Sequence, residues 1–524
     1  MILIKCTVAL AAATHILKVA ADNIGQFPLV PTAADKIGQW GPTVEFPLVP
    51  VAAAVVPQTG QLLVWSAGFD FDFIPITGET HTALYDPVTK NVSKLIVSNT
   101  HHDMFCPGIS RDFDGRLVVT GGNSAPRTSI YDPNSSSAWV SANDMKIPRG
   151  YQTSTMLSDG RIFTIGGSWS ENRDNLGGKN GEIYNPANDT WSLLPGCPVE
   201  PMLTADPEGI YRQDNHGWLF GWKRGSVFQA GPSREMNWYG TSGTGSTTPA
   251  GTRGSDPDAM CGIAVMYDAV AGKILTAGGS PQYRWASSTR NAHIITINDS
   301  LTNVTIEKID SMSEARTYAC GVVLPDGKVF ITGGQTWGEP FTDHNSSMIP
   351  ELWDPTTNRF AKMATLPTPR NYHSVAVLMP DATVFNGGGG LCSHWNCTIE
   401  NHPDGEFFSP PYLFERDGKA AQRPTISLIS SKTPRVSETI TVTVTDIAKT
   451  CKEVPTFSLI RIGSTTHAVD TDQRRVPLTP KSASADTYSL SLPSDPGVLT
   501  PGYWYLFALA CGVPSKAQTI LIRP

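Results

Sequence analysis

The sequence is short of charge: only 17% of its 524 residues are Asp, Glu, Lys or Arg. Neither sign dominates, since 47 acidic residues stand against 40 basic ones and the net charge is −7. This balance gives no reason to expect a nucleic-acid or anionic-membrane partner. The sequence also lacks any apolar run near the roughly 20 residues that span a bilayer, so we expect no membrane-spanning segment.

The N-terminus has the pattern of a secretory signal. Lys5 precedes an apolar run at 6–13 and small residues at 19–21, so we expect a signal peptide over 1–21 and an N-terminal segment over 22–40. Export would agree with the Asn-x-Ser/Thr sequons, which are acceptors for N-glycosylation. These sequons begin at Asn91, Asn134, Asn188, Asn298, Asn303, Asn345 and Asn396. We therefore predict a secreted, extracellular protein that is open to glycosylation.

Cysteine is scarce. The chain has nine, and Cys6 would leave with the signal peptide. In an oxidising compartment the others can pair. Cys392 and Cys397 are close enough in sequence for a local disulfide, and Cys451 and Cys511 could bridge the C-terminal segment.

The other four cysteines have no obvious partner. Cys261 and Cys320 lie in apolar strand patterns typical of buried thiols. Cys197 lies in a proline-flanked loop, and Cys106 lies in the stretch "HDMFCPG". Counting alone does not explain Cys106.

Glycine is abundant, with 47 residues, and much of it belongs to a repeat. A turn, an alternating apolar run and a glycine pair recur in "DGRLVVTGG", "DGRIFTIGG", "AGKILTAGG", "DGKVFITGG" and "DATVFNGGGG". The glycine pairs begin at residues 121, 166, 278, 333 and 387. This spacing of about 50 residues, with one double gap, is typical of four-stranded propeller blades of the kelch type.

We therefore predict an all-β protein with a seven-bladed kelch-type propeller over residues 41–412. A stacked β-sandwich is the alternative for this region. Beyond it the glycine pairs stop and the strands become short and rich in Thr, Val and Ser. That pattern favours an immunoglobulin-like β-sandwich over 420–524.

Three clusters stand apart from the repeat: "HDMFCPG", "RGYQTS" with Tyr151, and "RNYHSVAV" with Tyr372 and His373. His467 adds a fourth candidate in the C-terminal region. Two imidazoles with phenolic oxygens would suit Cu(II). Taken singly, each residue is more often an ordinary packing or hydrogen-bonded residue, and spacing alone does not bring them together.

Longer motifs connect these clusters. The sequence contains "HDMFCPG", "PRGYQ", "TIGGSWS", "MLTADPEGIYRQDNHGWLFGWKRGSVFQAGPS", "MNWYGTSG", "DAMCGIAVMYDAVAGKILTAGGSP", "NYHS", "FNGGGGLC" and "THAVDTDQRR". Together they resemble galactose oxidase and its fungal copper-radical oxidase relatives, from about residue 38 to the C-terminus. The resemblance leaves no room for the separate N-terminal carbohydrate-binding domain that is typical of galactose oxidase.

The resemblance implies one copper ion held by Tyr151, Tyr372, His373 and His467. It also implies a thioether between Cys106 and the Tyr151 ring, a self-derived radical cofactor. Trp169 would stack over this thioether and shield it. Tyr283 and the glycine run at 387–390 would orient the ligands from outside.

The implied reaction is the oxidation of a primary alcohol to an aldehyde, with O₂ reduced to H₂O₂. Copper exchanges one electron, and the Tyr151–Cys106 unit would hold the second. Tyr372 would accept the hydroxyl proton as general base. No organic cofactor is needed, and we expect a monomer acting on a small molecule.

Residues at the substrate position also follow from the resemblance. Tyr211 and Arg212 match family positions that contact galactose hydroxyls, and Phe341 matches an apolar wall, with Phe73 or Phe71 supplying another. Two departures are Glu208 and Arg284, each in place of a family glutamine, and Trp285 also changes the rim. The added arginine and carboxylate could favour larger galactosides such as raffinose-type sugars, or weaken galactose use in favour of aryl or alkyl alcohols. Retention of Trp169 and Arg212 favours the C6 hydroxyl of galactose or galactosides over aryl or alkyl alcohols.

Two other interpretations compete with this one. A kelch protein that only binds would be expected to have lost at least one of Cys106, Tyr151, Tyr372, His373 and His467, and all five are present. A glyoxal-oxidase-like aldehyde oxidase would share the copper residues but not the contexts of Trp169 and Arg212.

Overall fold

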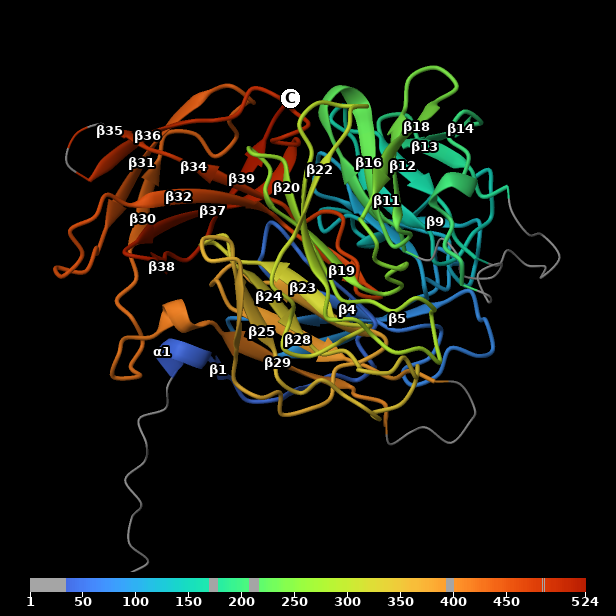
Figure 1. The fold of residues 1–524 in the computed structure, drawn as a ribbon, viewed down its shortest axis with the longest axis horizontal. Helices are drawn as coiled ribbons and strands as arrows, with labels where there is room; N and C mark the ends of the chain where they lie inside the picture. The colour runs from blue at the N-terminus through green and yellow to red at the C-terminus, as the bar shows by residue number, and fades with distance from the viewer. Residues whose placement is uncertain (1–33, 169–177, 207–215, 393–399, 483, 485) are drawn as a thin grey trace, which may run out of the picture.

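The computed structural model of the protein describes residues 34–168, 178–206, 216–392, 400–482, 484 and 486–524. Strands dominate this part of the chain (Figure 1), and its one α-helix is α1 (Ala34–Ile37). Short 3₁₀ turns occur at Glu200–Met202, Lys223–Gly225 and Pro411–Leu413. The all-β prediction is confirmed.

Seven sheets of the described residues form the propeller, numbered here as blades 1 to 7 along the chain. Blade 1 contains β3 (Ala52–Val55), β4 (Leu62–Trp65), β5 (Thr80–Tyr85) and β6 (Val92–Val97); blade 2 contains β7 (Gly108–Arg111), β8 (Leu117–Thr120), β9 (Thr128–Tyr131) and β10 (Trp139–Ala142). Blade 3 contains β11 (Thr153–Met156), β12 (Ile162–Ile165), β13 (Gly181–Asn185) and β14 (Thr190–Leu194); blade 4 contains β15 (Trp218–Gly221), β16 (Ser226–Gly231), β17 (Glu235–Gly240) and β18 (Ser246–Thr252). Blade 4 occupies the double gap in the glycine repeat.

Blade 5 contains β19 (Ile263–Asp268), β20 (Lys273–Ala277), β21 (Ala292–Thr296) and β22 (Thr305–Lys308); blade 6 contains β23 (Cys320–Val323), β24 (Val329–Thr332), β25 (Glu351–Asp354) and β26 (Arg359–Lys362). Blade 7 joins the two ends of the propeller, since β27 (Ser374–Leu378), β28 (Val384–Gly388) and β29 (Asp404–Ser409) pair with β1 (Gln39–Trp40) and β2 (Val44–Glu45) from the other end. This pairing closes the ring, and the stacked-sandwich alternative for this region is wrong.

The C-terminal region forms two further sheets, as predicted. One contains β30 (Thr425–Ile429), β31 (Thr439–Thr445), β35 (Lys481–Ser482) and β36 (Thr487–Ser491); the other contains β32 (Thr456–Arg461), β34 (Arg475–Leu478), β37 (Gly502–Ala510), β38 (Val513–Pro514) and β39 (Gln518–Ile522). One strand leaves this sandwich: β33 (Ser464–Thr466) pairs with β3 in blade 1. The C-terminal region therefore reaches into the propeller.

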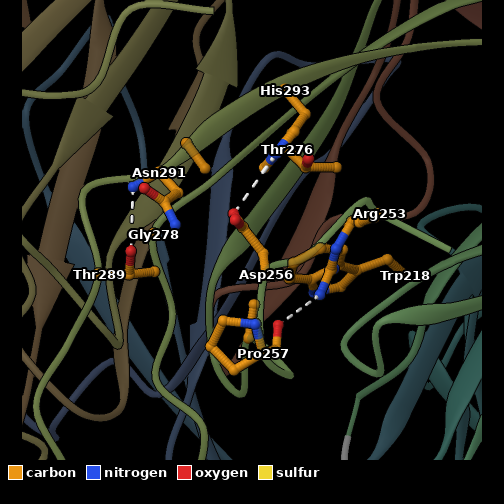
Figure 2. A pocket seen from close by; sticks show the side chains of 11 residues that line it. Trp218, Arg253, Asp256, Pro257, Thr276, Gly278, Thr289, Asn291 and His293 are labelled. Atoms are coloured by element: carbon orange, nitrogen blue, oxygen red, sulfur yellow. Dashed lines mark hydrogen bonds and ion pairs between the residues drawn. The ribbon is translucent and has the colours of Figure 1, made fainter. Parts of the chain in front are cut away.

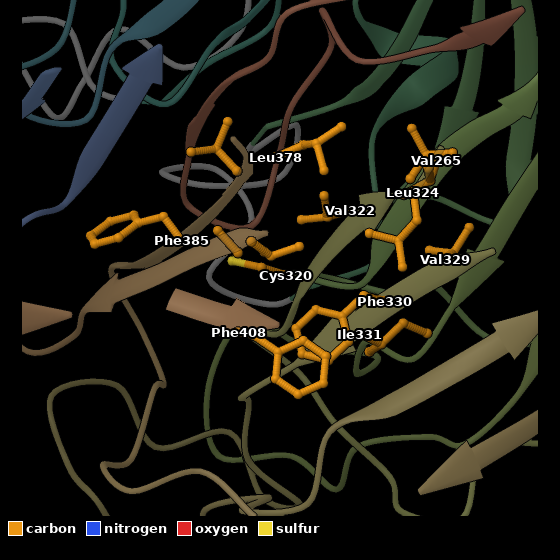
Figure 3. Packing of buried hydrophobic residues seen from close by; sticks show 14 of the residues in the cluster. Val265, Cys320, Val322, Leu324, Val329, Phe330, Ile331, Leu378, Phe385 and Phe408 are labelled. Carbon is orange, nitrogen blue, oxygen red and sulfur yellow. The ribbon is translucent and has the colours of Figure 1, made fainter. Parts of the chain in front are cut away.

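Apolar side chains fill the space between neighbouring blades. The largest cluster includes Phe330 of β24 and Phe408 of β29, whose rings stack at 4.4 Å (Figure 3). Strand alternation places such residues on the faces that adjacent blades share. Burial of this area is the main stabilising term of the propeller.

A buried ion pair repeats in blades 3, 6 and 7. The arginines Arg149, Arg316 and Arg370 pair with Glu182, Glu351 and Glu406 at 2.9, 2.7 and 2.7 Å, with both side chains of each pair almost fully buried. Each arginine also donates to the carbonyl oxygen of a repeat glycine. These pairs fix the start of each inner strand relative to the glycine pair of the same blade.

The repeat glycines need their lack of a side chain. A Cβ on Gly121 would lie 2.2 Å from the backbone oxygen of Arg149, and one on Gly333 would lie 2.0 Å from that of Arg370. Both glycines also have positive φ, at 62° and 69°. The glycine pair is therefore required where one blade approaches the next.

Blade 5 departs from this pattern. Ala259 stands at the arginine position and His293 at the glutamate position, and Arg253 of the preceding loop lies over Trp218 instead (Figure 2). His293 faces Asp256 at 3.4 Å across the small cavity drawn there. A histidine–aspartate contact therefore stands in blade 5 where the other three blades have an arginine–glutamate pair.

Candidate metal centre

The centre is built from one position of the repeat, the second residue before the innermost strand of a blade, which we call the axial position. In blades 2 to 6 the residue there has a left-handed backbone, with φ between 46° and 62°. The five residues are Cys106, Tyr151, His216, Cys261 and Tyr318. Blade 7 has Tyr372 at this position, followed by His373 with φ of 70°. A left-handed backbone is rare for such residues and commonly marks a functional site.

Backbone hydrogen bonds connect these positions from blade to blade. The amide of Tyr151 donates to the carbonyl oxygen of Cys106 at 2.9 Å, and the amide of His216 donates to that of Tyr151 at 2.8 Å. The amide of Tyr318 donates to the carbonyl oxygen of Cys261 at 2.9 Å. The unusual backbone is therefore held in place by the neighbouring blade.

His467 reaches the centre from the C-terminal region, directly after β33. The Thr466 hydroxyl donates to the backbone oxygen of Val51 at 2.9 Å, so it accepts from Nδ1–H of His467 at 2.6 Å. This arrangement leaves Nε2 of His467 as the nitrogen with a lone pair. The prediction that the last domain supplies an imidazole to the propeller agrees with this geometry.

His373 is oriented in the same way. Its Nδ1–H donates to the carbonyl oxygen of Gly390 at 2.6 Å. Its Nε2 is buried and has no hydrogen-bond partner within the described residues. Burial lowers the pKa of His373 to about 3 and that of His467 well below its usual value, so both imidazoles are neutral at neutral pH.

Three phenolic oxygens meet beside these imidazoles. Tyr151 Oη lies 2.7 Å from Tyr372 Oη, and Tyr283 Oη forms a short hydrogen bond with Tyr372 Oη. Burial and the neighbouring phenol of Tyr151 raise the pKa of Tyr372 well above its usual value. A phenolate there needs a cation close by, which fits a metal site.

Cys106 lies in the same cluster. Its Sγ is 3.4 Å from Nε2 of His467, and it packs with Tyr151 in one buried group. The ligand atoms of Cys106, His373 and His467 all lie within 4.8 Å of one another. The side chains of Tyr151 and Cys106 therefore lie in one buried cluster, as the predicted thioether requires.

This donor set suits a copper ion. Two imidazole nitrogens with lone pairs and two phenolic oxygens match the nitrogen and oxygen ligands that Cu(II) prefers in tetragonal geometry. The unpartnered Nε2 of His373 is otherwise hard to explain, because buried polar atoms are normally paired. The carbonyl of Gly390 and the hydroxyl of Thr466 orient the two imidazoles from outside.

Sequence reasoning missed His216 and Tyr318. The His216 ring stacks on that of His467 at 4.6 Å, and the hydroxyl of Tyr318 donates to the backbone oxygen of Tyr283. Burial lowers the pKa of His216 to about 3. Aligning the starts of the inner strands would have found both, since each occupies an axial position.

Aromatic rings cover the centre. Phe73 stacks on Phe105 at 4.9 Å and on Phe341 at 6.2 Å, and Phe341 contacts Tyr372 edge-on at 5.1 Å. Phe71 is exposed instead, so Phe73 is the member of this pair that lies at the centre. Arg284 is half-buried and follows Tyr283 in the same loop.

Several predicted residues lie outside the described part of the chain. They are Trp169, Glu208, Tyr211, Arg212 and Cys397. Cys392 is disulfide-bonded, and the Cys451–Cys511 disulfide is present with Cα atoms 5.8 Å apart.

Comparisons with known proteins match this chain to oxidases and to the kelch motif. Family models match residues 423–522 (galactose oxidase-like, early set domain), 249–412 (glyoxal oxidase N-terminus) and 149–198 (kelch motif). Galactose oxidase of Gibberella zeae is 49% identical over 96% of this chain and 73% of its own length. Aldehyde oxidase GLOX1 of Arabidopsis thaliana is 24% identical over 84% of this chain and 74% of its own length.

A solved structure is also similar. A fungal alcohol oxidase of the AA5 family, in complex with copper, aligns with a TM-score of 0.87 and 48% identity over 93% of this chain and 100% of its own. The propeller, the sandwich and the centre define a copper-dependent oxidase. The chain belongs to the galactose oxidase family. No helix in the described residues is long and apolar enough to cross a membrane.

Proposed function

We propose that the protein oxidises the C6 hydroxyl of galactose or galactosides to an aldehyde, reducing O₂ to H₂O₂. The observation that carries this proposal is the convergence of Tyr151, Tyr372, His373 and His467 on one buried point beside Cys106. The four are the copper ligands, and Cys106 forms the thioether with Tyr151. Each of these roles is assigned from geometry and family resemblance together.

Copper held by these residues would supply one-electron exchange and Lewis-acid activation of the alcohol. The protein supplies the rest. Tyr372 Oη accepts the hydroxyl proton as general base, and Tyr283 Oη shares a hydrogen bond with it that holds its orientation. The Tyr151–Cys106 unit takes the hydrogen atom from the carbinol carbon. The balance is one alcohol and one O₂ giving one aldehyde and one H₂O₂.

Burial supports the radical role of Tyr151. Its ring packs edge-on against His216 at 5.3 Å and against His467 at 5.2 Å, so water is kept from it. The family resemblance assigns a further part of this cover to Trp169, which lies outside the described residues. Exclusion of water protects reactive intermediates and strengthens the electrostatic interactions within the site.

The carbohydrate assignment rests on the family resemblance at Trp169 and Arg212, whereas Glu208 and Arg284 depart from the family pattern at the predicted substrate position. The identity of 49% with a galactose oxidase supports it. The apolar walls Phe73 and Phe341 favour a second candidate, the same chemistry on aryl or alkyl primary alcohols. The similarity to an aldehyde oxidase, at 24% identity, is weaker support for aldehyde substrates.

We also propose that the protein is secreted as a monomer, with a signal peptide over 1–21. The six sequon asparagines within the described residues are all exposed, which agrees with glycosylation on the way out. The propeller (41–412) and the sandwich (420–524) act as one catalytic unit, because His467 of the second completes the centre in the first.

The test is a substrate panel with copper-loaded protein. O₂-dependent H₂O₂ formation is measured on galactose, raffinose, benzyl alcohol, butanol and methylglyoxal. We expect the two sugars to give the highest kcat/KM. Peroxide from benzyl alcohol or butanol alone would replace the proposed substrate with the second candidate, and peroxide from methylglyoxal alone would indicate an aldehyde oxidase.

A further inference from the structure

Asp103, in the "HDMFCPG" stretch, is a fully buried carboxylate that the oxidase reaction does not use. Asn123 Nδ2 donates a hydrogen bond to it at 3.1 Å, and the amide of Phe105 donates one at 3.3 Å. No lysine or arginine within the described residues forms an ion pair with it. A buried charge without a cation beside it is costly, so this carboxylate needs a reason to be there.

Two further donors to this carboxylate are the backbone amides of Gly68 and Thr77. These residues are the ends of the segment 68–77, part of the loop between β4 and β5. The two ends meet, since a Cβ on Gly68 would collide with the hydroxyl of Thr77. Burial raises the pKa of Asp103 to about 6 against these hydrogen bonds, so the group is ionised at neutral pH. One carboxylate thus closes the base of the segment.

The segment carries Phe73 to the metal centre. The Phe73 ring stacks on that of Phe105 at 4.9 Å, and Phe105 contacts the His373 ring edge-on at 5.1 Å. Asn123 Nδ2 donates to the backbone oxygen of Phe73 at 3.3 Å as well as to the Asp103 carboxylate. Asp103 therefore holds this ring from the ends of its segment, through the amide of Asn123 and through the ring on which it stacks.

The part of the segment that follows Asp70 has little other support. Asp70 itself is anchored, because its carboxylate lies 2.8 Å from His81 Nδ1. Ile74 and Ile76, further along, are 42% and 59% exposed. Side chains that stay in water do little to fix a loop, because few buried contacts oppose its local opening. The position of Phe73 therefore depends mainly on the base of the segment.

We propose that Asp103 is a positioning residue that holds the Phe73 ring over the metal centre, where the ring forms an apolar wall for the substrate. Asp103 touches neither the substrate nor the ligand atoms of the centre, and it acts through Asn123, Phe105 and the two loop ends. The effect on the substrate rests on the proposed function, since it requires an alcohol bound against Phe73. The effect on the loop does not.

The kinetic experiment uses the copper-loaded enzyme with galactose and with benzyl alcohol. We expect Asp103→Asn to raise KM for both about fivefold, because an amide nitrogen then faces donors that the carboxylate accepted from. The copper content should not change, and kcat should stay within about threefold of wild type. Asp114→Asn, the same change at an exposed position, is the control and should keep the wild-type KM. A loss in kcat at unchanged KM would overturn the proposal.

A double-mutant cycle asks whether Asp103 acts through Phe73. We expect Phe73→Ala to raise KM about tenfold on its own. In that background Asp103→Asn should add less than about twofold, because the ring that it positions is gone. Two effects that multiply would show that Asp103 acts by another route.

Asn123→Ala keeps the cycle decisive if Asp103→Asn does not fold, because it removes only the side-chain link between Asp103 and Phe73. We expect it to raise KM about threefold in the wild type and to have no further effect in Phe73→Ala. An unchanged KM in Asn123→Ala would count against the proposal.

Hydrogen exchange read by mass spectrometry follows the loop without the reaction. The amides of residues 68–77 should exchange about tenfold faster in Asp103→Asn than in wild type, and those of β24 in blade 6 should not change. Equal exchange of the segment in both proteins would overturn the positioning role. Failure of the proposed function would instead appear as no peroxide from any alcohol, and the exchange measurement still decides the role of Asp103 in that case.

Discussion

The propeller contains the same cysteine–tyrosine pair twice. Cys106 and Tyr151 occupy the axial positions of blades 2 and 3, and Cys261 and Tyr318 occupy those of blades 5 and 6. Both pairs have left-handed backbones, and in both the tyrosine amide donates to the cysteine carbonyl at 2.9 Å. The repeat alone therefore gives the two pairs the same backbone.

Their neighbours differ. Cys106 is buried 3.4 Å from the His467 imidazole, and Tyr151 Oη reaches Tyr372 Oη. Cys261 is only half-buried, and the Tyr318 hydroxyl is used by the backbone oxygen of Tyr283. The repeat gives both pairs the same backbone position, and the segment inserted from the C-terminal region places the His467 imidazole 3.4 Å from the Cys106 sulfur. Cys261 and Tyr318 line a small cavity with His373 and His467.

Replacement of His467 should have the largest effect on copper binding and oxidase activity. We expect His467→Ala to lower copper affinity more than 100-fold, since loss of even an outer partner of a ligand costs about 10- to 100-fold. Oxidase activity should fall with the copper content. Copper is measured by metal analysis and by the Cu(II) electron spin resonance signal. His101→Ala, an exposed histidine, is the control and should bind copper normally. Full copper binding by His467→Ala would remove this residue from the ligand set.

The two cysteines should respond differently to the same change. Cys106→Ser should lower kcat by about 100-fold or more, because it removes the sulfur from the redox unit, a loss of about 3 kcal/mol in barrier terms. Cys261→Ser should stay within about threefold of wild type. Both are measured as peroxide production from galactose. Similar losses in the two variants would show that the pairs are not distinguished by their neighbours.

A third contrast concerns how the blades are fixed. His102 in blade 2 takes the place of an arginine, since its Nε2–H donates to Gly121 and its Nδ1 accepts from Ser129. Burial lowers the pKa of His102 from 6.5 to about 4. The unfolded state takes up the proton first, so stability falls as the pH drops from 6.5 towards 4. The expected loss between about pH 7.5 and about pH 5 is about 2 kcal/mol, measured by urea unfolding.

The matched variant is His102→Gln, which cannot titrate. Its free energy of unfolding should change less than that of the wild type over the same pH interval, by about 2 kcal/mol. An identical pH dependence in both proteins would place the titration elsewhere.

Tyr318→Phe should give the smallest effect. Its hydroxyl donates to the backbone oxygen of Tyr283. We expect kcat within about threefold of wild type, with a small change in KM because Tyr283 loses one of its supports. Steady-state kinetics on galactose measure both values. A loss as large as that of Cys106→Ser would make Tyr318 part of the redox unit.

Much of the fold could be predicted from the sequence because its repeat is explicit. Glycine pairs such as Gly121–Gly122 recur where blades approach one another, and no other residue fits there. The closure of blade 7 by β1 and β2 was not predicted, since strands of two or a few residues carry little pattern.

The centre was harder. Tyr151 and Tyr372 are separated by more than two hundred residues, and only family resemblance joined them. His216 escaped because a histidine before a strand has no distinct pattern. The Trp285 backbone could not be foreseen, since its left-handed φ depends on a hydrogen bond to another loop.

We expect the Cys106–Tyr151 pair, and not its repeat counterpart, to become the cofactor. Intact mass spectrometry of protein treated with copper and O₂ tests it most directly, followed by peptide mapping. We expect a mass about 2 Da below that of the disulfide-bonded chain, because two hydrogens leave when the thioether forms. The peptides of Cys106 and Tyr151 should be joined, and the loss should vanish in Cys106→Ser but persist in Cys261→Ser. An unchanged mass, or a joined Cys261–Tyr318 peptide, would contradict it.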